Sequence, residues 1–221
     1  MTDILIHGIN GKMGKAVYAA AAERRDFNVV CGVDKRPLGN FCCPVYTSLG
    51  EVSEHVDCII DFSSPNATSG VIDFALENEC ALLIATTGHS AAKLAEIERA
   101  SKCLPVFLSP NLSLGIDAVS RALPVMKEIL SGFDVTITEA HRKSKKDRPS
   151  GTALKLKNVL GGADVVSVRG GDIPGMHTVM FFGENEVVSV SHTIYSRDVF
   201  AKRALDIGAE LIKRPNGLYT E

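Results

Sequence analysis

The chain has 221 residues, and its 24 Lys and Arg against 26 Asp and Glu give a formal net charge of −2. This balance gives no electrostatic reason to expect nucleic acid or an anionic membrane as a partner. No stretch approaches the roughly 20 uncharged apolar residues of a membrane span, and the N-terminus lacks the pattern of a secretory signal. The six cysteines form no paired CxxC clusters, so a zinc site is not expected. The size of the chain and the lack of a secretory signal argue against a disulfide framework. We therefore expect a cytoplasmic protein.

Short apolar runs alternate with helical patterns over the first 108 residues. The predicted strands are residues 4–7, 27–33, 56–62, 81–85 and 104–108. The predicted helices are residues 12–25, a second helix that begins within 64–68, and residues 90–101. Strands that alternate with helices in this way predict a doubly wound parallel sheet of the Rossmann type, an α/β fold with helices on both faces.

The rhythm changes after residue 109. A helix is predicted over 116–130, an alternating strand over 134–139 and another helix from 149–152; β-rich segments follow at 165–169, 178–182 and 186–193, then a helix over 198–214. The β-rich segments predict a second, α+β domain with an open mixed sheet. The predicted division is residues 1–108 with 197–221 for one domain and 109–196 for the other.

Three glycines follow the first predicted strand and open the first helix, in Gly8-Ile9-Asn10-Gly11-Lys12-Met13-Gly14. Glycines there allow a tight turn and close approach of the backbone to a pyrophosphate, which the helix N-terminus attracts. Asp34 ends the second strand and is placed to accept hydrogen bonds from ribose hydroxyls. Lys35 and Arg36 follow directly and equally suit a 2′-phosphate, so the sequence leaves NADH and NADPH open. The alternative is that Asp34 is a solvated turn residue and the glycines serve only packing.

Polar loops also follow other strands of the predicted sheet, at residues 62–65, 86–88 and 109–112. The carboxyl ends of parallel strands meet at the edge where such sheets bind ligands. We interpret the three loops together as the nicotinamide pocket.

Residues 141–148 hold six basic side chains, counting His141, directly after an alternating strand. A solvated charge run is the simplest interpretation of such a segment. However, the run ends in Ser150-Gly151-Thr152 at a predicted helix N-terminus, which binds carboxylates through its free N–H groups. Clustered cations beside it suit a dianionic small molecule. His141, which titrates near neutrality, and Lys145 are the candidate acid/base pair.

These motifs, in this order, resemble the 4-hydroxy-tetrahydrodipicolinate reductase (dihydrodipicolinate reductase) family of the diaminopimelate route to lysine. The matching segments are the GxxGxMG start, Asp61-Phe62-Ser63, Thr86-Thr87-Gly88, Ser109-Pro110-Asn111, Glu139-Ala140-His141, Pro149 to Ala153, Arg169 to His177 and Gly217 to Thr220. The resemblance implies reduction of a cyclic dicarboxylate to tetrahydrodipicolinate with NADPH or NADH. It also implies a homotetramer formed through the second sheet, with residues 1–108 and 197–221 binding the dinucleotide and residues 109–196 serving substrate binding and oligomerisation.

The resemblance assigns site residues one by one. His141 and Lys145 match the catalytic pair, and the substrate residues are Arg142, Ser150, Gly151 and Thr152. The cofactor residues are Gly8, Ile9, Asn10, Gly11, Lys12, Met13, Asp34, Lys35, Ala85, Thr86, Thr87, Ser109, Pro110, Asn111 and Leu112. No metal is implied. The hypothesis needs the glycine turn and the loop near Lys145 to face a single cleft.

The sequence departs from the family at three positions. Arg142 stands where a second histidine is common, Ala85 where a glycine is common, and Arg148 where a small residue precedes the proline. The alternatives are a reductase acting on another imine or carbonyl, a nucleotide-sensing protein without turnover, and a nucleic-acid binder using the basic loop. The last is opposed by the net charge and by the absence of aromatic residues from 141–148.

Overall fold

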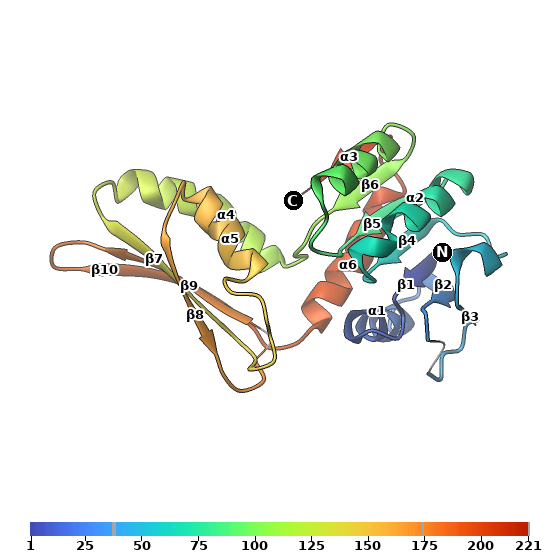
Figure 1. The fold of residues 1–221 in the computed structure, drawn as a ribbon, viewed down its shortest axis with the longest axis horizontal. Coiled ribbons are helices and arrows are strands. Elements are labelled where there is room, and N and C mark those ends of the chain that lie inside the picture. The colour runs from blue at the N-terminus through green and yellow to red at the C-terminus, as the bar shows by residue number, and fades with distance from the viewer. Residues whose placement is uncertain (37–38, 174, 221) are drawn as a thin grey trace. The chain divides into compact units, whose positions relative to one another are not determined.

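The computed structural model describes residues 1–36, 39–173 and 175–220. Contacts divide the chain into two compact units (Figure 1), Met1–Leu112 with Asp198–Glu221, and Ser113–Arg197. The division expected from the sequence was 1–108 with 197–221, and 109–196.

Within the described residues, the first unit contains a seven-stranded sheet in the order β11-β6-β5-β4-β1-β2-β3. Its strands are β1 (Thr2–His7), β2 (Phe27–Val33), β3 (Val45–Tyr46), β4 (Cys58–Asp61), β5 (Ala81–Ile84), β6 (Pro105–Leu108) and β11 (Gly217–Tyr219). Every pair is parallel. All residues of β4 and β5 are buried, as expected for strands covered on both faces.

Helices cover both faces of this sheet (Figure 1). One face packs against α1 (Lys12–Ala22) and α6 (Asp198–Leu211), through residues such as Val17 and Leu205. The other packs against α2 (Thr68–Glu77) and α3 (Ala91–Ala100), through Val71 and Ile97. Two short 3₁₀ turns, η1 (Leu49–Glu51) and η2 (Pro65–Ala67), lie in the connections.

The second unit is a mixed sheet with two helices on one face. The strands β7 (Asp134–His141), β8 (Asp164–Arg169), β9 (Gly175–Phe182) and β10 (Val187–Ile194) lie in the order β10-β9-β7-β8. β7 is parallel to β8 and antiparallel to β9. The helices α4 (Leu114–Ile129) and α5 (Gly151–Val159) close a core around Leu123, Ile137 and Phe181.

The predicted fold class is confirmed, while several boundaries differ. The helix predicted over 12–25 ends at Ala22, the last helix ends at Leu211 rather than 214, and the strand predicted over 56–62 is confined to Cys58–Asp61. The very short strands β3 and β11 were not predicted. In the described part of the chain, none of the helices combines the length and hydrophobicity needed to cross a bilayer.

Candidate active site

The glycine turn between β1 and α1 is shaped by close backbone contacts. Gly8 has φ +82°, and a Cβ there would lie 3.0 Å from the Phe62 carbonyl oxygen. A Cβ on Gly14 would lie 2.2 Å from the Gly8 carbonyl oxygen and 2.6 Å from the Cα of Ile9. Gly8 therefore needs the conformational freedom of glycine, and Gly14 is glycine because the turn folds directly onto the first turn of α1.

The Asp34 carboxylate lies at the end of β2, beside this turn. It accepts a hydrogen bond from the Asn10 backbone N–H (3.1 Å) and another from the Arg36 N–H (3.2 Å). A carboxylate has about four acceptor sites, so these two bonds orient Asp34 and leave it able to accept ribose hydroxyls.

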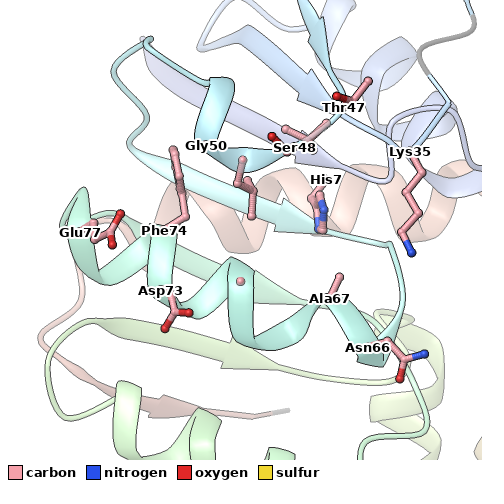
Figure 2. Close-up of a pocket in the computed structure, with 13 residues that line it drawn as sticks. His7, Lys35, Thr47, Ser48, Gly50, Asn66, Ala67, Asp73, Phe74 and Glu77 are labelled. Atoms are coloured by element: carbon pink, nitrogen blue, oxygen red, sulfur yellow. The ribbon is translucent and has the colours of Figure 1, made fainter.

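Adjoining hollows lie at this edge of the sheet. One of about 340 Å³ is lined by residues that include Gly8, Gly11, Asp34, Lys35 and Ser63. A second, of about 450 Å³, shares His7 and Lys35 with the first and continues between η1 and α2. Figure 2 shows Lys35 on the side of this second hollow where Asn66 lies. A third, of about 370 Å³, is lined by Asn10, Gly11, Lys15, Asp34 and Arg36. The space, the glycine turn and the donor and acceptor groups fit a dinucleotide.

Two histidine contacts, one buried and one half-buried, support this edge, and the sequence did not indicate them. His7 Nδ1 lies 2.9 Å from Oδ1 of the wholly buried Asp61, which also accepts from the Ser63 N–H (3.0 Å). His89 Nε2 lies 3.0 Å from the hydroxyl oxygens of both Thr68 and Thr86. These contacts fix the loops that follow β4 and β5.

The remaining predicted cofactor residues lie in the loops after the strands or, for Lys12 and Met13, at the start of α1, and several of their side chains are buried. Ile9, Thr86, Ser109 and Leu112 are buried, whereas Gly11, Lys12, Lys35, Thr87 and Pro110 are exposed, and Asn10, Met13, Ala85 and Asn111 are half-buried. Buried members of the set can contact a cofactor mainly through their backbone. The Ile9 side chain, for example, fills the space above Gly32.

A buried ion-pair network occupies the carboxyl end of β7 in the second unit. The wholly buried Glu139 carboxylate accepts from Arg169 Nη1 (2.8 Å, to Oε2) and from Arg169 Nη2 (2.7 Å, to Oε1). His141 Nδ1 is also hydrogen-bonded to Glu139 Oε2. The parallel register pairs His141 with Arg169 and Glu139 with Ser167, so strand pairing brings these groups together.

The charges of this network set its protonation. Burial alone would raise the Glu139 pKa, but hydrogen bonds from Arg169, Ser167 and His141 outweigh burial and lower the pKa to about 2. Burial lowers the pKa of His141, with Lys145 and Arg169 acting in the same direction and Glu139 opposing them. Glu139 is therefore an acceptor only, and the His141 imidazole is neutral near pH 7.

A second histidine supports the N-terminus of α5. His177 Nε2 lies 3.0 Å from Ser150 Oγ, which accepts from the Ala153 N–H (3.2 Å) and caps the helix. The His141 and His177 rings meet edge to face at 5.1 Å. Burial first, and then the neighbouring His141, lower the pKa of His177 to about 4. Ser150 is 2% exposed, so its hydroxyl serves the cap and His177.

Lys145 lies on the loop between β7 and α5, with its ammonium 2.8 Å from the Asp147 carboxylate. The structure gathers Lys145, His141 and the Ser150-Gly151-Thr152 helix start within one unit, and a Cβ on Gly151 would meet open space. Arg142 is half-buried on the same loop. From the sequence alone, no separate role was predicted for Glu139, Arg169 or His177.

Comparison with known proteins places both units in one family. Residues 2–112 match the family model described as "Dihydrodipicolinate reductase, N-terminus", and residues 115–221 match "Dihydrodipicolinate reductase, C-terminus". The chain is 40% identical to the 4-hydroxy-tetrahydrodipicolinate reductase of Caldanaerobacter subterraneus, over 100% of this chain and 96% of the relative. It is 34% identical to the reductase of that name from Clostridium tetani, over 99% and 95%.

A solved structure shares the fold. The dipicolinate-bound dihydrodipicolinate reductase of Paenisporosarcina sp. TG-14 superposes with a TM-score of 0.83 at 20% identity, covering 100% of this chain and 97% of that one. The chain therefore belongs to the dihydrodipicolinate reductase family, whose members are the NAD(P)H-dependent 4-hydroxy-tetrahydrodipicolinate reductases of lysine biosynthesis through diaminopimelate.

Proposed function

We propose that this chain performs the family reaction with His141 and Lys145 as its acid/base pair and the N-terminus of α5 as its carboxylate site. The observation that carries the proposal is the gathering of these groups in one unit, with His141 held by a buried carboxylate. Helix N-termini bind carboxylates through unpaired N–H groups, and the ammonium of Lys145 adds a charge that suits a dianionic ring.

The cofactor end of the proposal rests on the first unit. Gly8 to Met13 would hold the pyrophosphate, Asp34 the adenosine ribose, and the hollow between η1 and α2 the adenine ring. The loops at Ala85 to Thr87 and Ser109 to Leu112 would border the nicotinamide. Lys15 and Arg36, which line one hollow with Asp34, would contact the 2′-phosphate that distinguishes NADPH from NADH.

When bound, NAD(P)H would supply the hydride that reduces the electron-poor ring of the substrate. Gly151 and Thr152 orient one substrate carboxylate, and Arg142 offers a guanidinium to the other. Lys145 or His141 delivers the accompanying proton, and the pathway intermediate loses water at the same place. Orientation of the ring beside a proton donor is the source of rate enhancement.

A coupled assay tests this function. The upstream synthase would generate the unstable substrate, and absorbance at 340 nm would follow oxidation of NADPH and NADH in turn. We expect turnover with at least one cofactor. If the synthase product does not stimulate NAD(P)H oxidation but another imine or carbonyl compound does, the chain would instead be a different reductase of this fold.

The open face of the second sheet supports a homotetramer. Val166, Val168, Phe182 and Val187 lie on strands β8 to β10 and are 39–54% exposed, and exposed apolar patches of this kind mark interaction surfaces. We expect a tetramer by light scattering, and a smaller species when Val166 and Val168 are both changed to Glu.

The same proposal places the chain in the cytoplasm. All six cysteines are free thiols, two of them, Cys42 and Cys103, on exposed positions, which fits a reducing compartment. Cell fractionation with an antibody to the chain would check this location.

A further inference from the structure

Arg169 is connected to both members of the proposed catalytic pair. Its side chain is 2% exposed, and its two Nη groups clamp the Glu139 carboxylate. It also donates from Nε to the Lys145 carbonyl (3.3 Å), from Nη2 to the Asp147 carbonyl (2.6 Å) and from Nη1 to the Val168 carbonyl (2.7 Å). These five contacts match the five N–H donors of a guanidinium. A lysine cannot reproduce them, because its single ammonium lacks the planar fork.

Glu139 determines which nitrogen of His141 exchanges protons. The carboxylate is ionised and can only accept, so the Nδ1 that bonds to it must carry a proton. The Nε2 atom then holds the lone pair. A Cβ on Gly175 would lie 2.9 Å from that Nε2, so glycine at position 175 allows the imidazole to pack this closely against the backbone of β9.

We propose that Glu139 and Arg169 are positioning residues for the reaction: Glu139 fixes Nε2 as the proton-transfer atom of His141, and Arg169 holds both Glu139 and the backbone of the Lys145 loop. The proposal rests on the proposed function of His141 and Lys145. It adds that the buried guanidinium of Arg169 holds His141, through Glu139, and the backbone of Lys145 in fixed positions.

The charges around His141 explain why both residues are needed. The groups that face it are Glu139 on its own strand, Lys145 on the following loop, Arg169 on β8 and His177 on β9. Glu139 alone would favour the imidazolium, and Arg169 offsets that charge. With Glu139→Gln the raising influence is lost, so the pKa of His141 should fall further.

The test compares Glu139→Gln and Arg169→Lys with the wild-type enzyme. We expect kcat to fall about 10- to 100-fold in each, a fraction of the roughly 10²- to 10⁴-fold that general acid/base catalysis contributes, while KM changes less than about 3-fold. Imidazole ¹⁵N NMR, with the His141 signal assigned from His141→Ala, should show a lower titration midpoint in Glu139→Gln. Added guanidinium should restore part of the activity of Arg169→Ala.

Asp117→Asn is the matched control. It removes a carboxylate of the same unit that is bonded to Lys155 at 3.2 Å and is not among the charged groups that act on His141, and we expect wild-type kcat and His141 titration. Circular dichroism and the midpoint of urea unfolding check that each variant is folded, because NAD(P)H binding would report on the first unit alone. If Glu139→Gln does not fold, Glu139→Asp is the alternative variant. It keeps the negative charge but moves the carboxylate away from His141 by the length of one methylene, and it should show the same loss of kcat.

The variants distinguish the positioning roles of Glu139 and Arg169 from the catalytic roles of His141 and Lys145. Wild-type kcat and His141 titration in Glu139→Gln and Arg169→Lys, with His141→Ala inactive, would overturn the positioning roles and leave the proposed function intact. Full activity of His141→Ala would overturn the proposed function itself.

Discussion

Gly14→Ala should weaken cofactor binding through a steric conflict that the structure defines. The added Cβ would lie 2.2 Å from the Gly8 carbonyl oxygen, whereas ordinary contacts begin at 3.4 Å, and its other close neighbours are the backbone of Ile9. Because backbone cannot rotate away as a side chain can, the turn must move by roughly 1 Å. Overpacking of this kind costs about 1–3 kcal/mol.

If pyrophosphate binding requires the turn to return to its wild-type position, that cost is paid on binding and corresponds to a rise in Kd of about 5- to 150-fold. The increase would be measured by titrating the fluorescence of NADPH and of NADH with the protein. Gly208→Ala is the matched control, since it also lies in a helix of the first unit, where a Cβ would meet Cys58 Sγ at 3.7 Å and Ile60 Cδ1 at 3.9 Å, both ordinary contacts. A Gly14→Ala protein that binds either cofactor within about twofold of wild type would refute the reasoning.

Three further predictions concern selectivity, pH and stability. Arg36→Gln should weaken NADPH binding about 10-fold and leave NADH binding nearly unchanged, as measured by parallel titrations; equal losses would contradict the proposed 2′-phosphate contact. In the folded protein the pKa of His177 is about 4, below the usual value of 6.5. As pH falls, the unfolded chain therefore binds a proton at this histidine before the folded chain does. Up to about 3 kcal/mol of folding stability should be lost between about pH 6.5 and 4. Urea unfolding should show that His177→Gln flattens this slope. Phe181→Ala should cost about 3–5 kcal/mol, because the ring is fully buried in the second core; a cost under 1 kcal/mol in denaturant unfolding would argue against that packing.

Most of the fold could be predicted because its central strands are continuous apolar runs. Cys58–Asp61 and Ala81–Ile84 are buried throughout, and such runs between helical patterns indicate a parallel sheet. The strands β3 and β11 could not be found in this way. They are two and three residues long, too short to show a period, and they lie at the two ends of the strand order, where β3 pairs with β2 and β11 pairs with β6.

The site was predicted as a list of residues rather than as a network. His141 and Lys145 stand in a motif, but Glu139 and Arg169 are 30 positions apart and meet only because β7 and β8 pair in parallel register. One signal was present. Glu139 falls on the same alternate positions as the buried Ile137, and a carboxylate on an apolar strand face needs a charged partner.

The central claim is that the second unit performs the chemistry and the first unit binds the dinucleotide. The most direct test measures kcat and the NADPH Kd together for His141→Ala and Lys145→Ala. We predict that kcat falls at least about 100-fold in each, as expected for loss of a general acid or base, while Kd stays within about threefold of wild type. Parallel losses in kcat and cofactor affinity, or an unchanged kcat, would contradict the account.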